Sequence, residues 1–203
     1  MGRPSLATTR RPQIVEAAQR VIASRGITGM TMARIATEAG VQTSLVSHYF
    51  GSKRAVLLAT VQHAIEGYEA MLDEAVAGSH PENHFEELLE VSFGGHLLHK
   101  LYGAVIDEIR AAGNFDNEVK VALRGLYEVF HQTYLEAILD ARPDADPEDA
   151  SRIAYGMVCL FQTADSLDRL GFRRRDIGDG RVLARALLAS LDDTAPPPTG
   201  HTT

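Results

Sequence analysis

Short polar side chains gather in one segment of the chain, interleaved with apolar ones. Hydroxyl and amide groups of this size can donate to and accept from phosphate oxygens and base edges, and an imidazole can do so through its ring nitrogens. No nucleophile motif or metal-ligand motif accompanies them, so the segment favours reversible recognition over catalysis. The set is Gln42, Thr43, Ser44, Ser47 and His48.

The residues around this segment predict the helices that must hold it. Ile35, Val46 and Tyr49 can point into one small core, and Ala36 is small where two helices approach closely. Gly40 stands where the chain must turn, and glycine accepts a positive φ at little cost. We therefore expect helices at about 32–39 and 43–49, which together form a helix-turn-helix with its second helix in the major groove of DNA. An ordinary helical hairpin is the alternative.

The charge is divided unevenly along the chain. Residues 1–54 hold eight basic and two acidic residues, a net charge of +6, whereas the whole chain carries −7. A basic N-terminal part can neutralise phosphates and release counterions, while the acidic remainder resists wrapping DNA. This division favours DNA contact at one end of the molecule.

Length and composition set outer bounds. The 203 residues suffice for one large domain or two small ones, and 45% hydrophobic content is ordinary for a globular protein. We find no signal peptide and no apolar run long enough for a membrane span, and the lone Cys159 suits a reducing compartment, so we expect a cytoplasmic protein. Cys159 lies in an apolar run and is expected in the core.

Nearly the whole chain has helical periodicity, so we expect an all-α fold with about nine helices. The first helix should run from about 11 to 24, with Pro12 in its first turn and Gly26 after its end. Thr31 and Ser52 are the expected N-caps of the second and fourth helices. The fourth helix should run to about 77, and later ones should span roughly 82–93, 96–111, 116–141, 147–170 and 179–191. The domains follow as 10–54 for the helix-turn-helix, 55–192 for a larger helical domain and 193–203 for a disordered tail.

Residues 14–61 carry a resemblance to a known family. They read IVEAAQRVIASRGITGMTMARIATEAGVQTSLVSHYFGSKRAVLLATV, and this stretch resembles the tetracycline-repressor (TetR) family of transcriptional regulators almost continuously. The SHYF at 47–50 is mildly similar to the branch that includes choline-responsive repressors. Beyond about residue 65 only the helix number and lengths are similar.

The resemblance implies a homodimer that binds a palindromic DNA operator and needs no cofactor. It implies that a small-molecule effector binds the 55–192 domain, that helices eight and nine of two subunits pair, and that effector binding moves the fourth helix and releases the DNA. A ligand-responsive repressor is the function it favours; an activator, a metal-responsive regulator that uses histidines such as His80, His84, His96 and His99, and a nonspecific DNA-binding protein are alternatives. A helical interaction protein that binds no DNA also stays open.

Carried over by position, the resemblance also implies the residues that contact DNA. Thr31 could instead be only a cap, and Tyr49 only a core residue. Gln42 stands where the family usually has a serine cap, and Ser47 stands where a large aromatic is common. Arg3, Arg10 and Arg11 are expected in a flexible arm. The expected DNA contacts are Thr31, Arg34, Gln42, Thr43, Ser44, Leu45, Ser47, His48, Tyr49 and Lys53.

Effector-binding residues are expected among aromatic and polar side chains of helices four to eight. Any one of them is more often a core residue than a ligand contact. The absence of Trp disfavours a Trp-lined cage for a quaternary ammonium such as choline. The candidates are Tyr68, His96, Tyr102, Tyr127, Phe130, Met157, Phe161 and Asp165.

Overall fold

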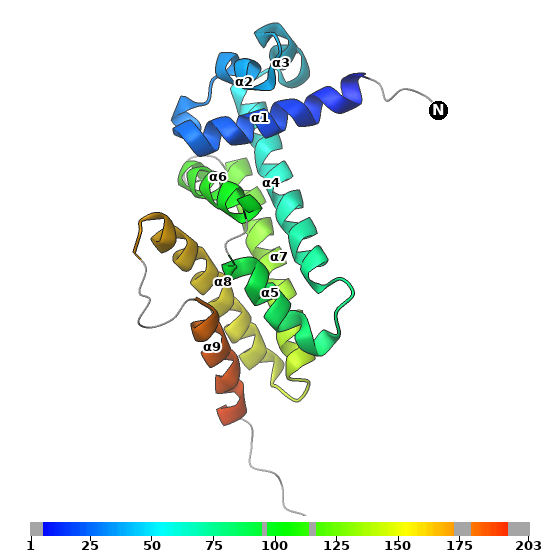
Figure 1. Cartoon of the computed structure of the whole chain (residues 1–203), viewed down its shortest axis with the longest axis vertical. Helices are drawn as coiled ribbons and strands as arrows, with labels where there is room; N and C mark the ends of the chain where they lie inside the picture. The colour runs from blue at the N-terminus through cyan, green and yellow to red at the C-terminus, as the bar shows by residue number, and fades with distance from the viewer. Residues whose placement is uncertain (1–5, 95–96, 114–116, 173–179, 195–203) are drawn as a thin grey trace, which may run out of the picture. The chain divides into compact units, whose positions relative to one another are not determined.

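The computed structural model describes residues 6–94, 97–113, 117–172 and 180–194. Within these ranges the chain forms α-helices, one short 3₁₀ helix and no strand, which confirms the expected all-α fold (Figure 1). The elements are α1 (Leu6–Gly29), α2 (Met32–Ala39), α3 (Thr43–Phe50), α4 (Lys53–Val76), η1 (Pro81–Asn83), α5 (His84–Phe93), α6 (Leu97–Gly113), α7 (Asn117–Ala141), α8 (Pro147–Arg169) and α9 (Gly180–Thr194).

The start of α1 differs from the sequence-based expectation. The helix begins at Leu6, five residues earlier than expected, so Pro12 lies inside it rather than in its first turn. Proline removes one backbone donor from a helix interior, yet the helix continues through this position. At the other end, Gly26 has φ 67° and ψ 172°, which breaks the regular helix close to the expected stop.

The described chain divides into two compact units. Unit 1 comprises residues 1–70 and 96–126, and unit 2 comprises residues 71–95 and 127–203. The long helices α4 and α7 each contribute residues to both units, and α6 belongs to unit 1 with the helix-turn-helix. Boundaries between these units fall within α4 and α7, whereas the sequence led us to expect one boundary between residues 54 and 55.

Unit 1 is built around α1, which packs against α2 and against α6. The apolar stripe of α1 is buried, as its period predicts. Val46 is the buried residue of α3, and Val105 and Ile109 are buried on α6. The buried residues of α1 and α2 include Ile14, Ala17, Ala18, Val21, Ile22, Ile35 and Ala36.

Unit 2 is a layered helical core in which α8 and α9 pack on α5. Its buried side chains come from every α-helix of the unit. Arg–Glu pairs also join α9 to α5: Arg185 contacts Glu86 at 2.6 Å and Arg181 contacts Glu90 at 2.9 Å. The buried apolar residues include Phe85, Leu88, Leu89, Phe130, Tyr134, Ile138, Ala150, Ala154, Met157, Phe161, Ala184, Leu188 and Leu191.

Two features of the C-terminal helices differ from expectation. Cys159 is exposed rather than buried, because Met157 and Phe161 of α8 face the core and residue 159 falls on the opposite side of the helical turn. Helix α9 extends to Thr194, and residues 195–203 of the expected tail lie outside the described part. No helix among the described residues is long and apolar enough to cross a membrane.

Candidate nucleic-acid interface

The turn between α2 and α3 has the geometry of a helix-turn-helix. Thr31 caps α2, its Oγ1 accepting a hydrogen bond from the backbone N–H of Arg34 at 3.2 Å. Gly40 ends α2 in the left-handed region with φ 64°, and the Val41 N–H returns to the Ala36 carbonyl at 2.9 Å. These local contacts fix α3 at a sharp angle to α2.

Helix α3 presents its polar residues to solvent and anchors itself through Val46. Val46 is fully buried, whereas Thr43, Ser44, Ser47 and His48 are all exposed. Gln42 occupies the N-cap position but its side chain makes no cap hydrogen bond there. The exposed side of α3 therefore carries the donors and acceptors that base edges and phosphates require.

Leu45 and Tyr49 lie between the buried side and the exposed side of α3. Both are half-buried, and the ring of Tyr49 meets the ring of His48 edge to face with centroids 5.6 Å apart. Tyr49 thus contributes to the core while part of its side chain stays accessible.

Arg34 and Lys53, both expected to contact phosphates, are also bonded to the end of α1. The Arg34 guanidinium donates to the Gly29 carbonyl at 2.7 Å, and the Lys53 ammonium donates to the Ile27 carbonyl at 3.0 Å. Each side chain has more than one N–H donor, so these contacts hold the charges in position and leave donors for a ligand. Lys53 begins α4, whose expected cap is present: Ser52 Oγ accepts from the Ala55 N–H at 3.1 Å.

A carboxylate from α6 completes this anchor and was missed by sequence reasoning. The Glu108 Oε2 accepts from the backbone N–H of Ile27 at 3.0 Å, beside the break at Gly26. The positive φ favours glycine at residue 26, and a Cβ there would lie 2.8 Å from Glu108 Oε2, so the end of that flexible side chain would have to move. The two residues are 81 positions apart, so no local pattern could have revealed the contact.

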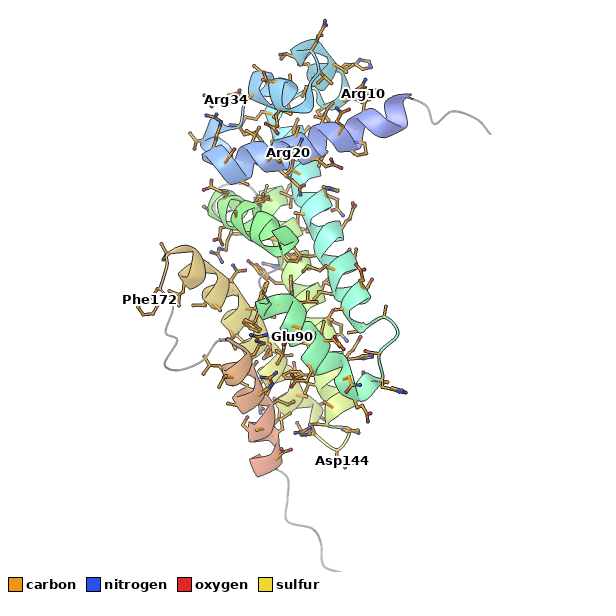
Figure 2. The ribbon with its side chains drawn as sticks, viewed as in Figure 1. Arg10, Arg20, Arg34, Glu90, Asp144 and Phe172 are labelled. Atoms are coloured by element: carbon orange, nitrogen blue, oxygen red, sulfur yellow. The ribbon has the colours of Figure 1, made fainter. Side chains whose placement is uncertain are left out.

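The N-terminal arginines are more ordered than expected. Arg10 and Arg11 lie on α1 rather than in a flexible arm, while Arg3 lies outside the described residues. The Arg11 guanidinium sits over the Phe50 ring at 5.0 Å from its centroid. Figure 2 shows Arg10 and Arg20 on α1 and Arg34 on α2, and Arg20 is paired with Glu38 of α2 at 2.7 Å.

Four of the effector-site candidates gather in unit 2. The rings of Phe130 and Phe161 stack with centroids 5.2 Å apart, and both side chains are buried. Met157 is also buried, and the Tyr127 hydroxyl donates to Gln162 Oε1 at 2.9 Å. Phe93 of α5, which sequence reasoning missed, meets Phe161 edge to face at 6.3 Å.

The other candidates are not brought into this cluster by any described contact. Tyr68 is buried in unit 1 at 2% exposure. His96 lies outside the described residues, as do the side chains of Tyr102 and Asp165.

A buried polar pair lies within unit 2. Ser92 Oγ and the Tyr134 hydroxyl are 2.5 Å apart, with Ser92 3% and Tyr134 0% exposed. Burial raises the pKa of Tyr134 to about 12, against a smaller opposing effect of the Ser92 hydrogen bond. Tyr134 therefore stays a neutral hydrogen-bonding group at physiological pH.

The histidines in the described part of the chain do not form a metal centre. His84 Nδ1 bonds to Asp140 Oδ2 at 3.0 Å, and His131 Nε2 lies 3.2 Å from the Ser151 carbonyl oxygen. Across the described residues, no group of three His, Cys, Asp or Glu side chains is arranged to hold a metal ion.

An apolar surface remains uncovered on α8 and α9. Large side chains on both helices, and just beyond the end of α8, are between 36% and 80% exposed. Leu170 is the most exposed of them, followed by Tyr155. Exposed apolar side chains that form a contiguous patch mark interaction surfaces, whereas singly scattered ones are normal. The set is Tyr155, Leu167, Leu170, Phe172, Val182 and Leu183.

Comparison with known proteins bears on the N-terminal segment and on the fold. Residues 14–60 match the sequence profile of "Bacterial regulatory proteins, tetR family". The chain is 37% identical over 97 residues to the HTH-type transcriptional regulator BetI of Rhizobium meliloti, and 34% identical over 94 residues to BetI of Brucella anthropi. These alignments cover 46% of this chain and 46% and 48% of the relatives, so the chain spans about half the length of the curated relatives it matches.

Solved structures resemble the chain over nearly its whole length. A transcriptional regulator from Pseudomonas aeruginosa PAO1 superposes with a TM-score of 0.75 at 18% identity, covering 93% of both chains. A regulator from Saccharomonospora viridis, solved in complex with choline, gives 0.72 at 19% identity over 92% of this chain and 95% of its own. A TetR-family regulator from Rhodococcus sp. gives 0.71 at 19% identity over 93% and 100%. At these identities the likeness establishes the fold, and the matched relatives are named as regulators rather than enzymes.

Proposed function

We propose that this chain, whose residues 14–60 belong to the tetR family of bacterial regulatory proteins, is a ligand-responsive transcriptional repressor that acts in the cytoplasm as a homodimer on a palindromic operator. The observation that carries the proposal is the division of α3 into a buried anchor, Val46, and an exposed polar side. A helix of this kind, held at its start by a capped partner helix, can enter a major groove without unfolding its own core.

Within this proposal, each DNA contact has a distinct role. Thr43, Ser44 and Ser47 read base edges, Leu45 touches a thymine methyl, and Gln42 is available to a base because it makes no cap bond. Thr31, Arg34, His48, Tyr49 and Lys53 hold the phosphate backbone. Arg34 and Lys53 suit this role because their bonds to the end of α1 fix their charges beside the helix-turn-helix.

The dimer forms, in our proposal, through the uncovered apolar surface of α8 and α9. Two copies of this surface would pair as a helical bundle and present two α3 helices to successive major grooves. Leu170→Glu places a charge at the most exposed apolar side chain and should yield a monomer, whereas Val121→Glu on α7, at 69% exposure, should not. Sedimentation or light scattering measures both, and dimeric Leu170→Glu would contradict this surface.

The effector is, in this proposal, a small molecule recognised by aromatic side chains of unit 2 such as Tyr127, Phe130 and Phe161. Their rings offer faces for apolar or cationic groups, and the Tyr127–Gln162 pair offers polar ones. Choline, found in the Saccharomonospora viridis neighbour, is the first probe. Loss of operator binding on adding choline would assign a quaternary ammonium effector. Unchanged operator binding would exclude choline as the effector of this chain.

The test of DNA recognition is selection from a random duplex pool by the purified full-length protein. We expect enrichment of a palindrome with half-sites separated by about one helical turn or more. Ser47→Ala should relax base preference at one position of each half-site, with a loss of about 1 kcal/mol for a single hydrogen bond. Ser190→Ala removes a matched exposed hydroxyl from α9 and should leave selection unchanged. Retention of DNA without any enriched sequence would instead indicate a nonspecific DNA-binding protein.

A further inference from the structure

Two adjacent arginines near the start of α1 have different environments. Arg11 stacks on Phe50 at the end of α3, with its guanidinium 5.0 Å from the ring centroid. Arg10 instead donates from Nη1 to the Gln13 side-chain Oε1 at 2.8 Å. Neighbours in sequence on a helix point about 100° apart, so the two guanidinium groups contact different partners.

Gln13 links Arg10 to the turn of the helix-turn-helix. Its Nε2 donates to the carbonyl of Ala39, the last residue of α2, at 2.8 Å. The amide orientation follows from the partners, because a guanidinium only donates and a carbonyl only accepts. Gln13 is therefore a bridge with one acceptor for Arg10 and one donor for the end of α2.

This bridge fixes a free cationic group beside the DNA-reading helices. Within the described part of the chain no carboxylate pairs with Arg10, in contrast to Arg20, which is paired with Glu38 at 2.7 Å. One of the five guanidinium N–H donors of Arg10 serves Gln13, which leaves the others for a phosphate. Arg10 is half-buried, so part of its side chain stays accessible to a ligand.

We propose that Gln13 is a positioning residue that holds Arg10 against a phosphate flanking the half-site read by α3. The inference rests on the proposed DNA-binding function and goes beyond it by assigning Gln13 and Arg10 to one phosphate-binding unit. In a helix-turn-helix the helix before the recognition helix crosses the phosphate backbone. A cation tied to the end of that helix lies close to the same backbone. The contact carries no base preference, so it adds affinity to every site alike.

Glutamine is the residue that this geometry requires. Glutamate keeps the acceptor for Arg10 but loses the donor for the Ala39 carbonyl, and asparagine is shorter by one methylene. Alanine removes both ends of the bridge and frees the Arg10 side chain to sample other rotamers.

The experiment measures the affinity of full-length variants for the palindromic duplex recovered by selection, and for an unrelated duplex of equal length, over a range of salt. Because the proposed homodimer carries two copies of Arg10, Arg10→Ala should weaken binding to both duplexes about 25-fold, about fivefold for each copy, and reduce the slope of log K against log salt by about 1.8. Arg10→Lys keeps the charge and should restore the slope. Arg152→Ala removes an arginine of α8 that is paired with Asp149 and should leave the slope unchanged.

A double-mutant cycle tests the role of Gln13. Gln13→Ala should weaken binding in the wild-type background and have no further effect once Arg10 is alanine, because the two residues act as a unit. Equal losses from Gln13→Ala in both backgrounds would overturn the positioning role and assign Gln13 to the Ala39 turn alone. If Gln13→Ala fails to fold, Gln13→Asn supplies the same cycle, because its side chain is shorter by one methylene and cannot span both Arg10 and the Ala39 carbonyl.

The outcomes separate this inference from the proposed function. Wild-type protein that binds neither duplex at low salt refutes both. If the wild-type protein binds DNA and Arg10→Ala has the same affinity and salt slope, the Arg10 contact is refuted and the proposed function stands.

Discussion

Gly26 and Glu108 should be energetically coupled, and the structure sets the size of each effect. Gly26 has φ 67° and ψ 172°, a region that glycine almost alone adopts, so alanine there should cost about 2 kcal/mol in backbone strain. The alanine Cβ would also lie 2.8 Å from Glu108 Oε2 and displace the carboxylate from the Ile27 N–H. An exposed hydrogen bond to a charged group is worth about 1 kcal/mol, so Gly26→Ala should destabilise unit 1 by about 3 kcal/mol.

The same bond is lost in Glu108→Ala, which alone should cost about 1 kcal/mol. In the Gly26→Ala background, however, Glu108→Ala should cost nothing more, because the bond has already been broken. Urea denaturation followed by far-UV circular dichroism gives the four free energies of unfolding. Gly40→Ala is the matched control: its φ of 64° is also positive, but a Cβ there meets nothing within 4 Å, so it should cost only about 1 kcal/mol and add independently to Glu108→Ala. A full 1 kcal/mol loss from Glu108→Ala in the Gly26→Ala background would refute the reasoning.

Three other predictions follow from buried or charged groups. Gln19, 3% exposed with an unpartnered Nε2, should be replaceable by leucine with a gain of about 1 kcal/mol in the free energy of unfolding, and a loss would mean that the amide is satisfied by water. Tyr134→Phe should cost about 1–2 kcal/mol because it leaves the buried Ser92 hydroxyl without its partner. It should also reduce the tyrosine absorbance change near pH 12 in an ultraviolet titration, and an unchanged amplitude there would contradict the assignment. Arg185 lowers the pKa of Glu86 and Arg142 lowers that of Asp192, so their stabilising contribution is present above the ordinary carboxyl pKa values and is lost as the pH falls through the lowered values of the folded state. Acid unfolding of the Glu86→Gln, Asp192→Asn double variant should therefore depend less steeply on pH than that of wild type, and parallel curves would show that these pairs contribute nothing.

The helix-turn-helix could be predicted from sequence because its determinants are local. The Thr31 cap, the Gly40 turn and the Val46 anchor act within a few residues, and the limits of α2 and α3 agree with expectation to within one residue. The start of α1 could not be predicted in the same way, since Pro12 is a favourable first-turn residue and nothing local marks the five residues before it as helical.

Contacts between distant segments account for the remaining differences. Glu108 reaches Ile27 across 81 residues and Gln13 reaches Ala39 across 26, and neither pairing leaves a periodic trace in the sequence. Cys159 is exposed because Met157 and Phe161 lie on the face of α8 that packs against the core. The residues from 157 to 161 are almost all apolar, so the sequence does not indicate which of them face the core. The cluster of Phe93, Phe130 and Phe161 likewise depends on how three helices meet.

The packing of α6 on α1 has a consequence for how the chain can be divided and recombined. The proposed DNA-binding segment ends at Lys53 in sequence, yet α1 is completed by a helix that begins more than forty residues later. A chimera that joins residues 6–54 to the C-terminal part of another regulator would leave the α6-facing side of α1 uncovered and the Ile27 N–H without Glu108. Exchange of DNA specificity between relatives should therefore succeed when α6 travels with the head, or when only the exposed positions of α3 are transplanted.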